Sequence, residues 1–265
     1  MKPPTSEPEA DPYAQPPKRR RGAVAAPAMR IDIHSHLLPN IDDGCKSDEE
    51  SIACVRKLKE AGYVGTICTP HIWPEAFPLN LPMQVRSWAG RMRDMLEDMG
   101  IEYQIWPGGE LRLFDGVIPF IEKNGVPTLG DSRFVLVDFW DKQWPKWANK
   151  TFEWFLANKY RPILAHPERI PDQRGDLNER LLEVEQMGVL LQGNSRSLTN
   201  GEGIPASMMV RQLLREQRLH FFALDMHRPD SLNQRLDGMS LLEVEFGNKL
   251  HDHFTITAPR VIVKP

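Results

Sequence analysis

Side chains that bind divalent cations recur along this sequence, and each lies at or shortly after the end of a run of residues with high β-strand propensity. In chain order these side chains are His34, His36, His71, Glu110, Asp138, His166, Asp225 and His227. Imidazole together with carboxylate is a ligand set that suits manganese, iron or zinc, whereas soft metals prefer thiolates. The pattern therefore predicts a site for divalent metal ions.

The segment His34-Ser35-His36 has the spacing needed to hold one cation. Because side chains alternate along an extended chain, the two imidazoles lie on the same side. With so many candidate ligands we expect more than one ion, and a carboxylate such as Glu110 can bridge neighbouring ions. A hydroxide held between metal ions is a strong nucleophile at neutral pH, so the pattern predicts hydrolysis. A second His-x-His, at His251 and His253, follows a helix and is expected on the surface.

The three cysteines do not fit a thiol-based phosphatase. Enzymes of that kind place an arginine six residues after the nucleophile, where it can cradle the phosphate. The corresponding positions after Cys45, Cys54 and Cys68 hold Ser51, Glu60 and Pro74. The sequence therefore favours metal-dependent chemistry.

From Met29 onward the chain repeats a unit of one strand-forming run and one stretch of helical period. The expected strands cover 30–34, 65–69, 102–106, 134–138, 162–166, 189–192 and 220–225, with a closing strand over 256–263. The expected helices lie between Ser47 and Gly62 and over 85–99, 117–123, 147–156, 177–187, 205–216 and 241–250. Such alternation gives parallel strands joined by right-handed crossovers.

About seven units in one domain predict a barrel, in which residues at the carboxyl ends of the strands share one face. The candidate ligands would then meet in one pocket. The alternative is an open doubly wound sheet, but no Gly-x-Gly-x-x-Gly phosphate loop follows the first strand.

The composition describes a globular domain with a separate N-terminal segment. The 265 residues carry a formal net charge of −3, so no overall positive field favours nucleic acid. No apolar run is long enough to span a membrane. Three cysteines are too few and uneven for a disulfide framework, which predicts a cytoplasmic location. Residues 1–28 are rich in proline and predict a disordered tail, so residues 29–265 form the expected domain.

Five motifs occur in an order that matches one known family. They are Asp32 to Pro39 followed by Asp42-Asp43-Gly44, then Thr69-Pro70-His71, Gly109-Glu110, His166-Pro167-Glu168-Arg169 and Asp225-Met226-His227. In this order they resemble the PHP (polymerase and histidinol phosphatase) superfamily. Within it, the sequence is most similar to the bacterial tyrosine-protein phosphatases associated with capsule and exopolysaccharide.

The resemblance implies a distorted (β/α)₇ barrel of TIM type that binds three divalent ions, commonly manganese. It implies as ligands His34, His36, Asp43, His71, Glu110, Asp138, His166, Asp225 and His227. Asp42 competes with Asp43 for its role, and Asp43 is favoured by its place before Gly44. The relatives usually carry glutamate in place of Asp138, whose shorter side chain implies an ion that is displaced, water-bridged or more weakly held.

The resemblance also implies a function. It implies hydrolysis of phosphotyrosine in proteins by a metal-activated hydroxide, with a bacterial tyrosine autokinase of polysaccharide synthesis and export as the partner. Arg169 and Arg228 are the candidate phosphate-binding residues, because a guanidinium can fork onto phosphate oxygens. Arg235 competes with Arg228 for the arginine that relatives carry after the last histidine. Trp140 and Trp144 either stack on the tyrosine ring or pack between helix and barrel, and packing is favoured.

Three other functions stay open at this point. Histidinol phosphate hydrolysis would use the same metal core, and so would an exonuclease, although the composition shows no basic groove. If Asp138 weakens one metal site, the chain could instead be a non-catalytic phosphate-binding module.

Overall fold

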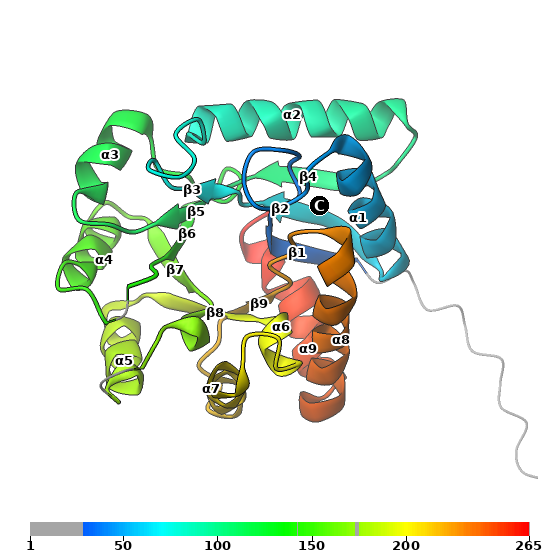
Figure 1. Cartoon of the computed structure of the whole chain (residues 1–265). Helices are drawn as coiled ribbons and strands as arrows, with labels where there is room; N and C mark the ends of the chain where they lie inside the picture. Colours follow the sequence, from blue (N-terminus) through cyan, green and yellow to red (C-terminus); the bar gives the residue numbers. More distant parts are fainter. Residues whose placement is uncertain (1–28, 142, 173–174, 265) are drawn as a thin grey trace, which may run out of the picture.

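The computed structural model describes residues 29–141, 143–172 and 175–264, so the predicted disordered tail lies outside the described residues. Strands lie in the middle of the molecule and helices lie around them (Figure 1). The strands are β1 (Arg30–Ser35), β2 (Tyr63–Cys68), β3 (His71–Ile72), β4 (Gln104–Pro107), β5 (Glu110–Arg112), β6 (Phe134–Asp138), β7 (Arg161–Ala165), β8 (Leu190–Asn194) and β9 (Phe221–Ala223). The helices are α1 (Asp48–Glu60), α2 (Pro82–Asp98), α3 (Val117–Asn124), α4 (Ala148–Ala157), α5 (Leu177–Met187), α6 (Ser195–Leu198), α7 (Ile204–Arg215), α8 (Pro229–Phe246) and α9 (Asn248–Asp252).

The strands form two parallel sheets, with orders β1-β2-β4 and β3-β5-β6-β7-β8-β9. Only Thr69 and Pro70 separate β2 from β3, and only Gly108 and Gly109 separate β4 from β5. Proline has no backbone N–H to donate to a neighbouring strand, so the first interruption follows from the sequence. The predicted α/β class with parallel strands is therefore confirmed, and two of the expected strands are each followed by a second short strand that was not predicted.

A parallel bridge pairs Ser35, at the end of β1, with Met226, just after β9. The backbone N–H of His36 donates to the carbonyl of Met226 at 2.7 Å. The first and last strands of the chain are thus neighbours, and the two sheets meet at this point.

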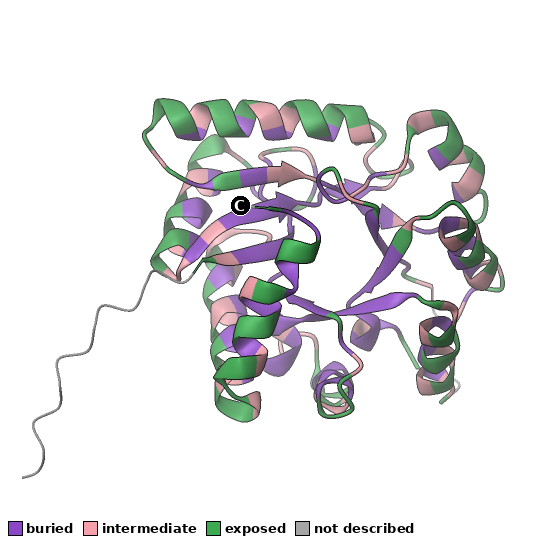
Figure 2. Cartoon of the chain, turned by 180° about the vertical axis from the view of Figure 1, so that it is seen from behind, coloured by how far each residue is buried: buried purple, intermediate pink, exposed green. Residues whose placement is uncertain are grey.

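Alternation along the strands separates an inner from an outer face. On β6, Val135 and Val137 pack toward the helices, whereas Phe134 and Leu136 belong to a second cluster with residues from the other strands. Asp138 continues the inner series at the carboxyl end of β6, since successive side chains point to opposite faces. The inner face is therefore apolar at the start of the strands and polar at their ends. Figure 2 shows the same division, with buried strands inside and helices exposed on their outer sides.

Helix α1 begins where the sequence predicts. The side chain of Ser47 accepts a hydrogen bond from the backbone N–H of Glu50, as an N-cap residue should. The reciprocal half of the capping box is shifted by one residue, because the Glu50 carboxylate accepts from the N–H of Lys46.

Two predictions for the C-terminal part are wrong. The last long helix begins at Pro229 rather than near Leu241, because proline at a first helical position needs no N–H partner. The segment predicted as a closing strand is instead a π-helical turn, His253–Thr257, followed by a 3-10 turn, Pro259–Val261. Its buried residues Phe254, Ala258 and Ile262 recur every four positions, which is a helical spacing and not the two-residue spacing of a strand.

Ala258, Ile262 and Val263 pack with Ile31, Phe134 and the other apolar residues of the inner cluster. The C-terminal turns thus cover the end of the strands opposite to the polar one. Within the described residues, no helix is both long enough and apolar enough to cross a bilayer.

Candidate metal centre

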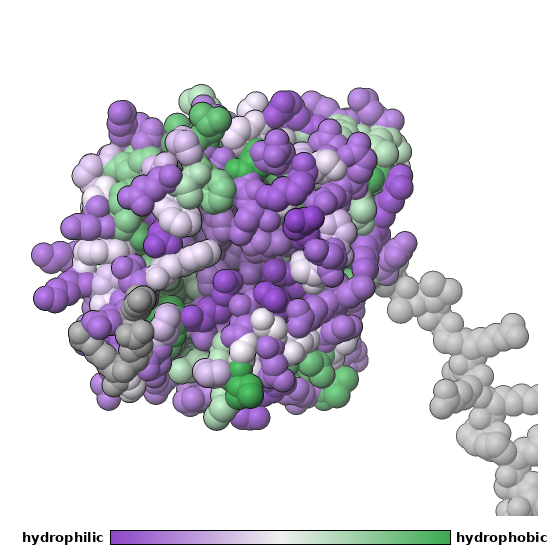
Figure 3. Space-filling view, in the orientation of Figure 1, coloured by the Kyte–Doolittle hydropathy of each residue, from purple (hydrophilic) through white to green (hydrophobic). Residues whose placement is uncertain are grey.

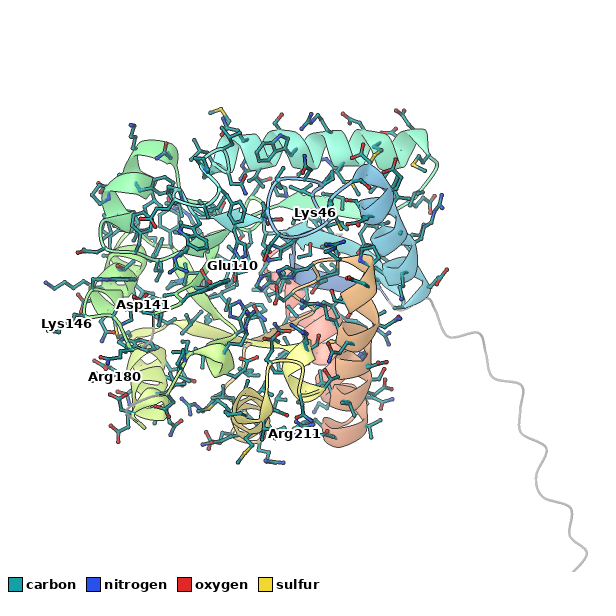
Figure 4. All side chains as sticks on the ribbon, viewed as in Figure 1. Lys46, Glu110, Asp141, Lys146, Arg180 and Arg211 are labelled. Atoms are coloured by element: carbon teal, nitrogen blue, oxygen red, sulfur yellow. The ribbon has the colours of Figure 1, made fainter. Side chains whose placement is uncertain are left out.

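The predicted ligands meet on the side of the fold where β1, β2, β4, β6 and β7 end, with His71 and Glu110 as the first residues of the short strands β3 and β5. Glu110 lies in the middle of the molecule, whereas Lys146, Arg180 and Arg211 lie at its edge (Figure 4). Hydrophilic side chains gather over the same central region of the face seen in Figure 3. Strand ends bring these residues together because parallel strands all finish at one side of the fold.

Three groups of side chains have ligand atoms within 4.8 Å of one another. The groups share members, so they form one continuous cluster instead of separate sites. They are His36, Asp43, His71 and His227; His34, Glu110 and His166; and His34, His36 and Asp225.

Glu110 lies between four histidines of this cluster. One carboxylate oxygen lies 2.8 Å from His166 Nε2, and the other lies 2.9 Å from His71 Nδ1. The second oxygen is also 3.4 Å from His34 Nε2 and 3.5 Å from His36 Nε2. A carboxylate in this position can bridge neighbouring ions, as expected from the sequence.

Asp42 and Asp43 occupy different positions around His36. Asp42 Oδ2 lies 2.7 Å from His36 Nδ1, on the side of the ring that faces away from Glu110. Asp43 Oδ1 lies 3.5 Å from His71 Nε2 and 3.6 Å from His227 Nε2, and its side chain is 51% exposed. Asp42 therefore orients a histidine from behind, as outer carboxylates do in metal sites. The ligand role of Asp43 stays a prediction.

The loop that carries both aspartates lies tightly against β1. A Cβ atom at Gly44 would lie 2.0 Å from the carbonyl oxygen of His36, so any other residue would push the loop away. Gly44 also donates its N–H to Asp42 Oδ1 at 2.9 Å. The glycine thus permits the close approach that puts Asp42 behind His36.

Gln192 orients the other histidine of the motif. Its side-chain oxygen lies 2.9 Å from His34 Nδ1, which directs Nε2 toward the cluster. The Nε2 atoms of His34 and His36 are both buried and have no hydrogen-bond partner. A buried polar atom without a partner is costly, and an imidazole nitrogen held this way has the free lone pair that a metal ion requires. The donor set and its orientation therefore fit divalent ions.

The histidines of the cluster lower the pKa values of its buried carboxylates. Burial alone would raise the pKa of Glu110, but the imidazoles of His34 and His71 hold it well below its usual range. Burial would likewise raise the pKa of Asp225, but the neighbouring imidazoles of His227 and His34 hold it well below its usual range. Both carboxylates are therefore ionised and able to act as ligands.

Asp138 differs from the other predicted ligands, because the structure does not bring it into any of the three groups. The indole N–H of Trp140 donates to Asp138 Oδ2, and Oδ1 is buried without a partner. Burial and the negative charge of Glu110 raise the pKa of Asp138 to about 7. The side chain of Asp138 thus lies beside the cluster, and one of its oxygens accepts the hydrogen bond from Trp140.

The candidate arginines have different surroundings. Arg169 Nη1 lies 3.3 Å from Asp225 Oδ2, which places its guanidinium at the edge of the cluster. Arg228 instead pairs with Glu50 on α1 at 3.3 Å, and its side chain is 42% exposed. Arg235 is buried, donates to the carbonyl of Leu224 at 2.7 Å, and approaches His227 Nδ1 at 3.2 Å. The structure therefore brings Arg169 and Arg235 to the cluster and leaves Arg228 beside α1.

Trp140 and Trp144 also have different surroundings. Trp140 is 48% exposed, and its ring lies edge-on to His71 at 5.9 Å between centroids. Trp144 packs edge-on against Phe139 at 5.0 Å and donates to Asn149, as expected for packing between helix and strand.

Two further expectations concern histidine and cysteine. His251 is buried, with 3% exposure, so its predicted surface position is wrong, whereas His253 is exposed. The backbone carbonyl of His251, in α9, accepts a hydrogen bond from the hydroxyl of Thr255 in the following π-helical turn. All three cysteines are buried thiols, and burial raises the pKa of Cys68, so it is no nucleophile.

Residues 30–264 match the family model described as capsular polysaccharide synthesis, CpsB/CapC. The chain belongs to the CpsB/CapC family. The predicted resemblance to the capsule-associated branch is therefore confirmed, and the match covers nearly all of the described residues.

The relatives of this CpsB/CapC chain include proteins named as tyrosine-protein phosphatases. Tyrosine-protein phosphatase YwqE of Bacillus subtilis is 30% identical over 221 residues, which cover 83% of this chain and 86% of YwqE. Tyrosine-protein phosphatase CpsB of Streptococcus pneumoniae is 29% identical over 248 residues, which cover 88% of this chain and 98% of CpsB.

Solved structures agree with the family assignment. A crystal structure from a study of YwqE and CpsB, described there as metal-dependent tyrosine phosphatases, superposes on the CpsB/CapC chain with a TM-score of 0.78. The two chains are 29% identical, and the alignment covers 88% of this chain and 94% of the other. The phosphotriesterase homology protein of Escherichia coli superposes with a TM-score of 0.55 at 11% identity, which shows a similar fold.

Proposed function

We propose that this protein is a metal-dependent protein-tyrosine phosphatase. The observation that carries the proposal is the convergence of the predicted imidazole and carboxylate ligands around Glu110, in a chain whose relatives are tyrosine-protein phosphatases. The reaction would cleave the bond between phosphorus and the tyrosine oxygen, with water supplying the oxygen that phosphate gains.

The proposal includes a closed, distorted (β/α)₇ barrel formed by residues 29–265 as one domain. Joining β2 with β3 and β4 with β5 reduces the nine strands to seven. The bridge between Ser35 and Met226 supports closure, because it links the first strand to the end of the last. Closure would bring all strand ends around one centre, which is the arrangement that the clustered ligands require.

The cluster would hold several divalent ions, and we propose three, with manganese favoured over iron or zinc. The three groups, which are linked through His34 and His36, would supply most of the ligands, with Asp138 as an additional carboxylate. When bound, the ions would activate water for attack on phosphorus and offset the charge that develops on the phosphoryl oxygens.

The chain's own residues would orient the substrate. Arg169, held by Asp225 and by Glu202 at 3.4 Å, can turn its remaining N–H groups toward the phosphoryl group. Its side chain is 30% exposed, so it remains accessible to a ligand. The partner that we propose is a phosphotyrosine protein, in particular a bacterial tyrosine autokinase of polysaccharide synthesis.

A panel of substrates and metals tests this function. The protein is stripped with a chelator, reloaded with manganese, iron or zinc, and assayed with a phosphotyrosine peptide, histidinol phosphate and an oligonucleotide. We expect phosphate release from the peptide, restored most strongly by manganese and absent from the stripped protein. Faster release from histidinol phosphate would assign that substrate instead. Metal uptake without release of phosphate from any substrate would indicate a binding module.

Trp140 is expected to stack on the substrate tyrosine, because it is the exposed aromatic ring beside His71. A stacked aromatic pair contributes about 0.5–1.5 kcal/mol, so Trp140→Ala should raise KM for a phosphotyrosine peptide roughly 2- to 12-fold. Trp140→Phe keeps a ring and loses the hydrogen bond to Asp138, which separates stacking from that contact. We therefore expect Trp140→Phe to retain most of the wild-type KM.

Trp144→Ala is the matched control for this experiment. Because Trp144 packs on Phe139, its loss should lower the melting temperature and leave KM for the peptide unchanged. Equal KM values for Trp140→Ala and the wild type would exclude stacking on Trp140.

A further inference from the structure

Arg112 lies on the same face of β5 as Glu110. Two residues separate neighbours on one face of a strand, so the side chains of Glu110 and Arg112 share the inner face, and Leu111 points to the outer core. In the parallel pairing of β5 with β6, Arg112 lies beside Asp138 and Glu110 lies beside Leu136. Arg112 is thus one step beyond the ligand cluster, toward the open end of the strands.

Two tryptophans hold the guanidinium of Arg112. Its central carbon lies 4.3 Å from the centre of the Trp73 ring and 5.6 Å from that of Trp140. The two rings lie 5.9 Å apart, and the ring of Trp140 reaches His71 at the same distance. Cation–π contacts of this kind fix the plane of a guanidinium and leave its N–H edge free.

One end of the Arg112 guanidinium has no hydrogen-bond partner. Its Nη1 is buried and has no hydrogen-bond partner, and the part of the chain that the structure describes offers no carboxylate within ion-pair distance. Asp138, its neighbour in register, already accepts from the indole N–H of Trp140. Arg169 and Arg235, by contrast, are both paired with Asp225.

A buried cationic N–H without a partner is unfavourable unless an anion completes it. The position of Arg112 beyond Glu110 and its contact with Trp140 put this N–H donor at the mouth of the ligand cluster. The anion that must enter this mouth in the proposed reaction is the phosphoryl group of the substrate.

We propose that Arg112, clamped between Trp73 and Trp140, binds the phosphoryl oxygens of the substrate and is a specificity-determining residue of this site. The proposal rests on the proposed function, and it adds a residue that lies outside the ligand motifs. The clamp would present a planar donor edge to the phosphoryl oxygens while Trp140 contacts the aryl group on the same substrate. One wall of the mouth would thus recognise both halves of phosphotyrosine.

The test compares Arg112→Met and Arg112→Lys with the wild type, all loaded with manganese. Methionine keeps an unbranched apolar side chain and removes the charge, whereas lysine keeps the charge and loses the planar fork. The first measurement is the Kd for inorganic phosphate by calorimetry, which requires no turnover. The second is kcat/KM for a phosphotyrosine peptide.

Arg133→Met is the matched control. Arg133 also lies over an aromatic ring, that of Tyr160 at 5.7 Å, but it precedes β6 and so lies at the opposite end of the strand from Asp138. We expect this variant to match the wild type in both measurements. Circular dichroism and metal content show whether each variant is folded and loaded.

A hydrogen bond to a charged group contributes enough that Arg112→Met should weaken phosphate binding and lower kcat/KM about 10- to 100-fold. Arg112→Lys should lie between Arg112→Met and the wild type. An unchanged Kd for phosphate in Arg112→Met would overturn the proposal, and a rise in KM for the peptide alone would then assign Arg112 to supporting the tryptophans. Should Arg112→Met fail to fold, the same Kd comparison with Arg112→Lys decides. Weaker phosphate binding in a protein whose wild type hydrolyses nothing would sink the proposed function and retain the anion site.

Discussion

A variant that carries both His34→Ala and His36→Ala is expected to lose its metal ions and to hydrolyse phosphotyrosine at least about a thousandfold more slowly. Each histidine belongs to two of the three ligand groups, and every group contains at least one of them, so the double substitution leaves no group intact. Bound ions contribute several kcal/mol of transition-state stabilisation, and each 1.36 kcal/mol corresponds to a factor of ten in rate. Elemental analysis of the purified protein and kcat/KM for a phosphotyrosine peptide measure the two effects.

The control removes two histidines that lie outside the cluster. His220 and His253 are both exposed, so His220→Ala with His253→Ala should retain metal content and rate. If the His34/His36 variant kept the wild-type rate, hydrolysis by a metal centre would be excluded. If it lost the ions but kept the rate, the ions would be structural.

The sequence predicts this cluster well because its ligands follow a simple rule. Each sits where a strand-forming run ends, and in a parallel fold these ends share one side. The rule needs only the strand boundaries, and for His34, Glu110 and His166 an error of one or two residues does not matter. It also explains why residues more than a hundred positions apart, such as His34 and Asp225, come within 3.4 Å.

Residues that only position a ligand are harder to predict from the sequence. Asp42 and Gln192 orient His36 and His34 from behind, but nothing in their spacing distinguishes them from other polar residues. Arg112 had a signal that spacing alone could have revealed, since it lies two residues after Glu110 on the same face of a strand. What the sequence does not contain is the stacking on Trp73, which follows a different strand.

The errors in the fold come from apolar residues whose spacing fits two periods over a short segment. Phe254, Ala258 and Ile262 repeat every four residues, but this segment also contains several β-branched residues, such as Ile256 and Val261, which favour a strand by propensity. In the folded protein, a helical backbone lets Ala258 and Ile262 pack against the apolar end of the inner face. The start of α8 was missed for a different reason. Its first half is mostly polar, so it lacks the apolar spacing that would have indicated a helix beginning at Pro229.

Glu110→Gln is expected to abolish activity almost as completely as the loss of both histidines. The amide has the shape of the carboxylate but no charge. Only its oxygen has a lone pair to offer to a cation, because its other end is an NH₂ group. In the wild type both oxygens face the cluster, one toward His166 and the other toward His71, His34 and His36. A bridging role therefore cannot survive the change, and we expect kcat/KM to fall by about a thousandfold.

The same variant separates metal binding from folding. In the wild type, manganese at a hundred times its Kd should stabilise the native state by about 2.7 kcal/mol per site, a rise of roughly 5–10 °C in Tm for a domain of this size. In Glu110→Gln most of that rise should vanish, whereas Glu102→Gln, at an exposed position just before β4, should retain it. A full thermal shift with manganese in Glu110→Gln would contradict the bridging role, because ions that bind as tightly without this carboxylate do not depend on it.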